Sequence, residues 1–154
     1  IMEVNMEIKD IIDRHLIITN LKCQTKNEAF QKMSHILLKE DYISDIENFI
    51  RDLYVREAEG QTGIGNFIAI PHSKSPFVKK IGVAIAINQT EIPWETLDGK
   101  GVKVIVMFAV GDDNEDVKEH LKLLSLFARK LGNDSVVENL INSKTVDDVI
   151  NAFI

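Results

Sequence analysis

A nearly unbroken apolar run at residues 102–110 constrains the fold more than any other feature of the sequence. Only Lys103 interrupts it, so a strand formed by this segment would need cover on both of its faces. Such strands are typical of the centre of a sheet that lies between two helical layers. The run is much shorter than the roughly 20 apolar residues that cross a bilayer. We therefore expect a central β-strand in an α/β protein, and no direct membrane insertion.

Segments with helical or strand-like patterns lie on both sides of this run. Six segments have helical spacing or helix-start signals: residues 8–14, 25–37, 44–59, 114–132, 135–141 and 146–153. Three more segments are strand-like: residues 16–21, 67–70 and 81–87. Helices before, around and after a block of strands predict a three-layer α/β sandwich, with a mixed β-sheet flanked by helices on both faces.

Local signals locate several of these helices. Thr25 with Glu28, and Ser44 with Glu47, have the spacing of capping boxes, in which the first side chain caps a helix start. In the helix 114–132, one set of residues recurs at helical spacing and is expected to face the core: Val117, Leu121, Leu124, Ala128 and Leu131.

Composition and charge exclude several classes of protein. The chain has 154 residues, of which 45% are hydrophobic, and no repeat or linker divides it, so residues 1–154 are expected to form one domain. The net charge is −6 and the 18 basic residues are scattered, which argues against nucleic-acid binding. Cys23 is the only cysteine, so an intrachain disulfide is impossible and an intracellular location is favoured.

The segment 61–73 carries the most informative chemistry. Gly63 and Gly65 allow a tight turn and close approach to another group. Pro71 keeps the preceding residue extended, so His72 follows a strand end, where α/β sheets commonly place reactive groups. A neutral imidazole is a nucleophile near pH 7, and a phosphoryl group on it is labile enough to be passed on. An isolated Pro-His pair also occurs in ordinary turns and does not decide the function.

Two further side chains have positions suited to an anion. His120 lies within the first two turns of its helix, where free N–H groups and the helix dipole attract phosphate. Arg56 follows the apolar stripe of its helix just before the glycine loop, and its forked donors suit phosphate. The alternatives are a histidine at the edge of the core and a salt bridge from Arg56 to Glu57, Glu59 or a distant acid.

Other candidate sites are poorer. His35 is expected to be exposed, His15 follows a short helix, and Cys23 is expected to be buried or inert. The Gly63–Gly65 pair lacks the third glycine of a dinucleotide fingerprint, and no Walker phosphate loop or recognised zinc spacing occurs. A generic nucleotide-binding domain is therefore not favoured.

Taken together, these motifs resemble the signature of the fructose/mannitol-type enzyme IIA domain of the bacterial sugar phosphotransferase system. The resemblance is carried by Arg-Glu at 56–57, Thr-Gly-Ile-Gly-Asn at 62–66 and Ile-Ala-Ile-Pro-His at 68–72. It continues through Leu-Asp-Gly at 97–99, the apolar run and Glu-His-Leu at 119–121, and covers nearly the whole chain.

The resemblance implies a five-stranded mixed sheet and a phosphocarrier mechanism. By it, His72 accepts a phosphoryl group on Nε2 (as tele-phosphohistidine) from the phosphocarrier HPr and donates it to the cysteine of a cognate enzyme IIB. His120 stabilises the phosphoryl group and Arg56 lies beside it. We expect Thr62, Gly63 and Gly65 in the phosphate loop, and Ile64 and Phe67 as apolar candidates for the partner surface, although Phe67 could instead begin the core of its strand.

No metal or organic cofactor is implied, and the resemblance implies a cytoplasmic protein that reaches the membrane component IIC through IIB. Two functions remain open: sugar uptake, with residues 94–99 more fructose-like than mannitol-like, and the nitrogen-regulatory branch, in which the phosphorylation state controls partners. No IIB or IIC segment occurs in these residues. We therefore expect both on separate chains, or on a fusion partner that has been lost.

Overall fold

The computed structural model describes residues 7–154, and the single-domain expectation for residues 1–6 lies outside that range. A 3₁₀ helix, η1 (Arg14–Leu16), precedes the first strand. The α-helices are α1 (Ile8–Ile11), α2 (Lys26–Lys39), α3 (Ile46–Glu59), α4 (Asn114–Leu131), α5 (Asp134–Ile141) and α6 (Val146–Ala152). The strands are β1 (Ile17–Leu21), β2 (Gly63–Gly65), β3 (Ile68–Ala69), β4 (Gly82–Ile92) and β5 (Val102–Ala109).

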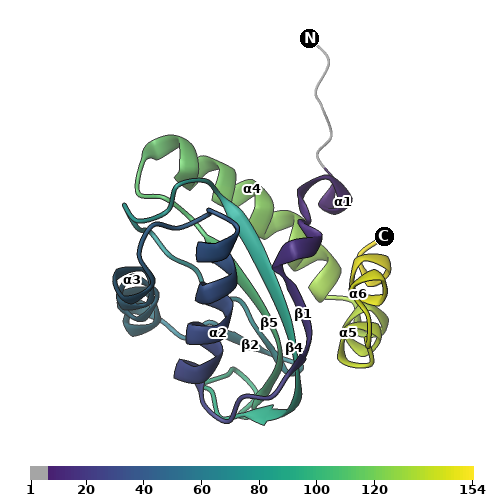
Figure 1. Ribbon diagram of the computed structural model, residues 1–154. Helices are drawn as coiled ribbons and strands as arrows, with labels where there is room; N and C mark the ends of the chain where they lie inside the picture. The colour runs from purple at the N-terminus through teal and green to yellow at the C-terminus, as the bar shows by residue number, and fades with distance from the viewer. Residues whose placement is uncertain (1–6) are drawn as a thin grey trace.

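The strands form one mixed sheet in the order β1-β4-β5-β3-β2. Figure 1 shows β4 between β1 and β5. β1 is parallel to β4 and β3 is parallel to β5, whereas the β4–β5 and β2–β3 pairs are antiparallel. The apolar run therefore forms the central strand, as predicted. β2 was not predicted. It has only three residues, lies within the glycine loop and is flanked by polar residues, so it gives no strand pattern in the sequence.

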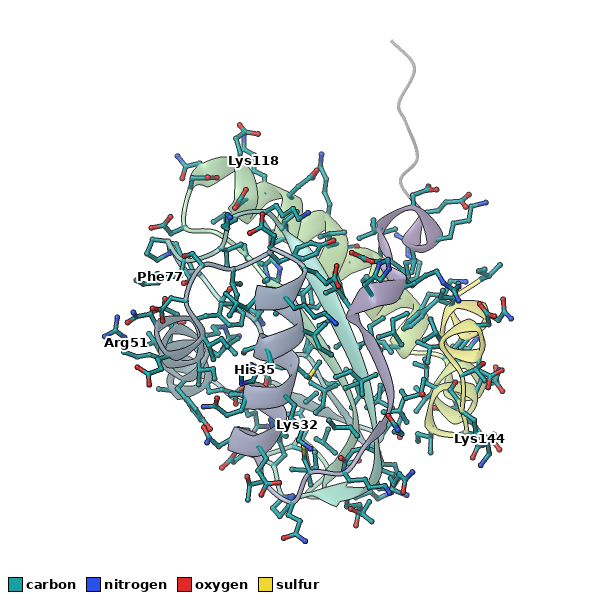
Figure 2. All side chains as sticks on the ribbon, viewed as in Figure 1. Lys32, His35, Arg51, Phe77, Lys118 and Lys144 are labelled. Atoms are coloured by element: carbon teal, nitrogen blue, oxygen red, sulfur yellow. The ribbon has the colours of Figure 1, made fainter. Side chains whose placement is uncertain are left out.

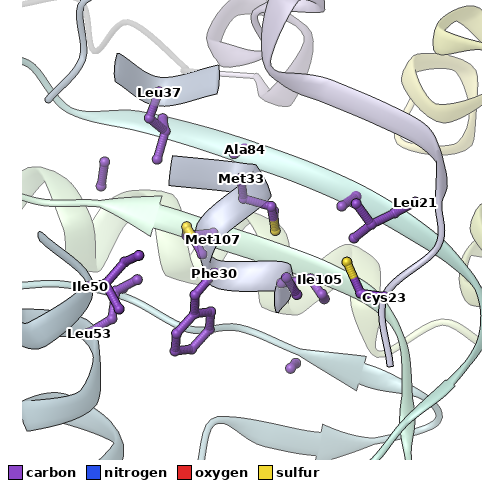
Figure 3. Packing of buried hydrophobic residues seen from close by; sticks show 14 of the residues in the cluster. Leu21, Cys23, Phe30, Met33, Leu37, Ile50, Leu53, Ala84, Ile105 and Met107 are labelled. Atoms are coloured by element: carbon purple, nitrogen blue, oxygen red, sulfur yellow. The ribbon is translucent and has the colours of Figure 1, made fainter. Parts of the chain in front are cut away.

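Two hydrophobic cores lie on opposite faces of this sheet, which confirms the predicted three-layer architecture. Residues 105, 107 and 109 of β5 point into the core beneath α2 and α3, while residues 104, 106 and 108 point into the core beneath α1, α4, α5 and α6. Figure 3 shows the first core, where Phe30 and Met33 of α2 pack against Ile105 and Met107. This alternation is why β5 is apolar at almost every position.

The core face of α4 differs from the prediction. Its buried residues are His120, Leu123, Phe127 and Leu131. Leu121 is 61% exposed and Ala128 is also exposed, so the predicted stripe was wrong at these two positions, whereas Leu131 is buried and Leu124 packs against the core from its edge. Phe127 buries far more apolar surface than Ala128, and the rotation of the helix that buries Phe127 also turns His120 inward.

The helix starts were predicted with partial success. Thr25 accepts a hydrogen bond from the Glu28 N–H, as expected, but the Glu28 carboxylate accepts from Gln24 rather than from Thr25. The predicted cap at Ser44 was wrong, because Asp45 caps α3 by accepting from the Asn48 N–H at 2.8 Å. Aspartate and serine are equally good caps, so the sequence did not distinguish the adjacent positions.

None of the helices formed by residues 7–154 combines the length and apolar character that spanning a membrane requires.

Candidate functional site

The backbone around His72 is fixed to the central strand. The chain beyond β3 continues parallel to β5: the Phe108 N–H donates to the Pro71 carbonyl at 2.9 Å, and the Ser73 N–H donates to the Phe108 carbonyl at 3.2 Å. The Ser73 hydroxyl donates to the Val110 carbonyl and accepts from the Val110 N–H, both at 2.9 Å. His72 therefore follows the carboxyl end of β3, as predicted, and lies beside the carboxyl end of the parallel strand β5.

A hydrogen bond determines which ring nitrogen of His72 is free. Nδ1 lies 3.0 Å from the Ile70 carbonyl oxygen. A carbonyl can only accept, so Nδ1 carries the proton and Nε2 keeps its lone pair in the neutral ring. Burial lowers the pKa of His72 and the Arg56 charge lowers it further, against the opposing effect of the Ile70 hydrogen bond. The half-buried ring is therefore a neutral nucleophile near pH 7.

His120 lies directly beside this ring. The two ring centroids are 4.8 Å apart with an interplanar angle of 33°, and the edge of Phe108 packs on His120 at 5.4 Å. His120 is 9% exposed, and its Nδ1 has no hydrogen-bond partner within residues 7–154. Burial, with the charges of His72 and Arg56, lowers the pKa of His120 to about 4. The structure thus brings the two predicted histidines together, with a buried polar atom left for a ligand.

Arg56 lies in the last turn of α3 and its charge acts on both histidines. Its Nη1 donates to the Gly60 carbonyl at 2.9 Å. The alternative of a salt bridge to Glu57 is not observed, because Glu57 binds Lys26 and Thr62 instead. The guanidinium keeps most of its donors for a phosphate-like group.

The glycine loop packs too closely for larger residues. A Cβ on Gly63 would lie 2.5 Å from the Glu95 carbonyl oxygen and 2.4 Å from the Thr96 methyl group. Gly65, Asn66 and Phe67 all have positive φ, at 98°, 54° and 66°. Three such residues in succession reverse the chain sharply, so β2 folds back onto β3 and leads directly to the His72 segment.

The other predicted loop residues have different surroundings. Thr62 is buried and donates to Glu57, so it anchors the loop from within. Ile64 is 37% exposed. Phe67 is half-buried beneath the ammonium groups of Lys100 and Lys103, outside both cores, and β3 begins one residue later. The alternative that Phe67 begins the core of its strand is therefore wrong.

Three residues shape the site in ways that the sequence did not predict, although Glu57 and Asp98 stand within the motifs that carry the resemblance. Ser73 fixes the histidine segment, Glu57 anchors the loop, and Asp98 accepts from the Asn66 N–H at 3.1 Å and so holds the reversed turn. Asp98 could have been recognised as the start of an Asp-Gly turn. Ser73 carries no local signal, because its partner Val110 is 37 residues away, and the Lys26 partner of Glu57 is 31 residues away.

The remaining candidates lie elsewhere. His35 is exposed on α2, as expected (Figure 2). The exposed His15 ring contacts Asp13 at 3.0 Å, and Cys23 is buried. Within residues 7–154, no three metal-ligating side chains gather as a metal site would require.

The fold and site define an α/β protein with two adjacent neutral histidines and an arginine at the carboxyl ends of parallel strands. Residues 10–154 match the family described as "Phosphoenolpyruvate-dependent sugar phosphotransferase system, EIIA 2". The chain therefore belongs to this family, whose members are phosphotransferase components.

Relatives within the family differ in their stated roles. The chain is 30% identical over 147 residues to the PTS system fructose-specific EIIA component of Haloferax volcanii, covering 94% of each chain. It is 27% identical to the PTS system 2-O-alpha-mannosyl-D-glycerate-specific EIIABC component of Escherichia coli K12, with 98% of this chain covered, but spans only 23% of that relative's length. The crystal structure of nitrogen regulatory protein IIA-Ntr from Neisseria meningitidis has a TM-score of 0.83 and 27% identity, with 96% and 99% of the two chains covered.

Proposed function

We propose that this chain is a cytoplasmic, single-domain phosphocarrier for sugar uptake of the fructose type. It accepts a phosphoryl group from phospho-HPr on His72 and passes it to an enzyme IIB, through which it associates with the membrane component IIC. The observation that carries the proposal is the neutral His72 ring, which the Ile70 carbonyl holds with Nε2 free and whose centroid lies 4.8 Å from the centroid of the His120 ring. The fructose-specific relative supports the sugar class.

The geometry accounts for each bond in the transfer. The Nε2 lone pair of His72 forms the new N–P bond, and the electrons of the breaking P–N bond return to the donor histidine. The proton on Nδ1 stays in its hydrogen bond to the Ile70 carbonyl. In the second half-reaction, a cysteine thiolate of IIB forms an S–P bond, and His72 leaves as the same neutral tautomer. No proton need move at His72 in either step.

His120 and Arg56 have distinct tasks in this scheme. The transferring phosphoryl group spreads negative charge over its oxygens, and the forked donors of Arg56 match them. A phosphoryl group on His72 also places negative charge beside His120 and so raises the pKa of that ring. His120 can then take up a proton and donate a hydrogen bond to the phosphoryl oxygens. In the unphosphorylated protein its lowered pKa keeps the ring neutral near pH 7.

A phosphorylation assay tests the proposal. Purified chain is incubated with phosphoenolpyruvate, enzyme I and HPr, and phosphohistidine is measured by mass spectrometry under alkaline conditions. The wild type should carry one phosphoryl group on His72, and His72→Ala should carry none while its circular dichroism is unchanged. The matched control is His35→Ala, which removes an exposed histidine of α2 and should be labelled normally. Unaltered labelling of His72→Ala would exclude the proposed acceptor.

A second candidate is favoured by one observation. The nitrogen regulatory protein IIA-Ntr from Neisseria meningitidis superposes on 96% of this chain. In that alternative, phosphorylated His72 controls partner binding and the group reaches no sugar. Purified phosphorylated chain is mixed with the IIB and IIC proteins of its own organism and labelled fructose. Formation of fructose phosphate would establish uptake, and retention of the group on His72 would favour regulation.

A further inference from the structure

We propose that Lys26, Glu57 and Thr62 form a buried network that positions Arg56 for phosphoryl transfer without touching the phosphoryl group. These three residues, hereafter the anchoring network, connect α2, α3 and the glycine loop. The inference rests on the proposed function of His72.

Glu57 is the centre of the anchoring network. Its side chain is only 8% exposed, yet it lies immediately after Arg56, in the last turn of α3. It accepts from the Lys26 ammonium at 3.1 Å and from the Thr62 hydroxyl. A buried carboxylate without partners would be strongly unfavourable, so these contacts hold α3 and the loop in one arrangement.

Lys26 connects the two segments against which the glycine loop packs, α3 and the segment after β4. Besides Glu57, it binds Glu95 at 2.7 Å, and its ammonium lies 4.9 Å from the centre of the Trp94 ring. The Glu95 carbonyl oxygen lies so close to the loop that a Cβ on Gly63 would be 2.5 Å from it. Burial alone would lower the pKa of Lys26, but the hydrogen bonds and charges of Glu95 and Glu57 raise it above its ordinary value. Lys26 therefore remains a cation that ties α3 to the segment after β4.

The link to Arg56 runs through the loop backbone. The guanidinium donates to the Gly60 carbonyl, and Thr62, two residues further on, is fixed by Glu57. The Thr62 carbonyl also accepts from the Ile70 N–H at 3.0 Å, and the Ile70 carbonyl in turn holds the His72 ring. The anchored Thr62 thus helps to fix both the loop segment that binds Arg56 and the Ile70 segment that binds the His72 ring. Fixed geometry matters because a misplacement of about 1 Å can reduce a transfer rate by about 100-fold.

Thr62→Val tests this role, because valine keeps the shape and removes the hydroxyl. Transfer from phospho-HPr should show a kcat lowered about 10-fold to 100-fold, with KM within about twofold, since the partner surface is unchanged. Thr62→Ser restores the hydroxyl and should recover most of the rate. The matched control is Tyr54→Phe, which removes another hydrogen bond between α3 and α2, from Tyr54 to Asn27 at 3.2 Å, and should leave kcat unchanged.

The pKa of His72, measured by NMR, gives a second readout that loss of stability alone would not change. Arg56 lowers the pKa of His72. If Thr62→Val displaces the guanidinium from the site, the pKa of His72 should rise, although the substitution itself changes no charge. Glu57→Gln keeps an acceptor for the Thr62 hydroxyl but removes the charge. It should retain more of the transfer rate than Thr62→Val if the hydroxyl contact is the essential one.

An unchanged kcat together with an unchanged His72 pKa in Thr62→Val would overturn the inference. Failure of the wild type to be phosphorylated would count against the proposed function instead, and the NMR result would still decide whether the network positions Arg56.

Discussion

The rings of His72 and His120 lie 4.8 Å apart, one at the end of a strand and the other on the buried face of α4. Neither ring is charged near pH 7, because burial disfavours the imidazolium form of both and each is close to Arg56. One phosphoryl group on the first ring would therefore meet the second ring and the guanidinium together.

His120 should make the stability of the protein depend on pH. Its pKa falls from 6.5 in the unfolded chain to about 4 in the folded protein. Between these values the unfolded state binds more protons, so the free energy of unfolding decreases as the pH falls below 6.5 and is fully retained above it. Urea unfolding at pH 7.5 and pH 5 should show about 2 kcal/mol less stability at the lower pH from this residue. His120→Asn should lose that part of the difference, and an equally steep pH dependence in the variant would contradict the assignment.

His120→Ala should separate acceptance from onward transfer. The nucleophile, Nε2 of His72, is intact in this variant, so phospho-HPr should still label it. Transfer to IIB should be slower by about 10-fold to 100-fold, because a group that stabilises the transferring charge has been removed. Rapid-quench measurement of both half-reactions gives the two rates. Labelling that vanishes here but persists in His72→Ala would reverse the two roles.

Arg56→Gln should raise the pKa of both histidines. The guanidinium lowers the pKa of His72 and of His120, and glutamine removes its charge while keeping much of its length. The histidine Hε1 chemical shifts, followed by NMR from pH 4 to pH 9, report both values. Arg51→Gln is the matched control, since Arg51 lies exposed on the same helix (Figure 2) and should shift neither pKa. Equal shifts in both variants would show that Arg56 has no special position.

Gly63→Ala should destabilise the loop. Its Cβ would overlap the Glu95 carbonyl oxygen, at 2.5 Å, and the Thr96 methyl group. Forcing an extra methyl into such a contact costs about 1–3 kcal/mol. Gly60→Ala provides the comparison, because its Cβ would come no closer than 3.9 Å to Arg56. Urea denaturation should therefore separate the two variants, and equal stability would mean that the loop can move away from the Glu95 segment.

The sequence predicted those features that depend on patterns within one segment. The central strand followed from the apolar run, and the position of His72 followed from Pro71 at the end of a strand. The core face of α4 was mispredicted at Leu121 and Ala128, because the stripe through Leu121 and the stripe through Leu123 and Phe127 overlap, and only packing of Phe127 against Phe108 selects the second. The contacts from Ser73 to Val110 and from Glu57 to Lys26 join segments distant in sequence and leave no periodic signal. The contact from Glu57 to Thr62 spans only five residues, but it crosses the end of a helix, where no helical period relates the two positions.

We expect HPr and IIB to bind one shared surface of this chain. Under the proposed function, both proteins would have to reach Nε2 of the same half-buried histidine, so their contacts should overlap around residues 62–74 and the start of α4. Ile64 is 37% exposed, and Leu97 is 74% exposed in the segment that pairs with the glycine loop through Thr96 and Gly63. Phe67, an earlier candidate, is covered by Lys100 and Lys103 and should contribute less.

A small apolar contact of this kind suits a transient complex, because it allows fast release. Leu97→Glu and Ile64→Glu should each raise KM for phospho-HPr and for IIB about 10-fold, with kcat nearly unchanged, because the charge removes a buried contact without altering His72. Leu38→Glu, on the exposed face of α2 away from the site, should change neither constant. NMR titration of the labelled chain with HPr and then with IIB shows which amides shift. Two sets of shifted amides that do not overlap near His72 would mean that the partners use separate surfaces.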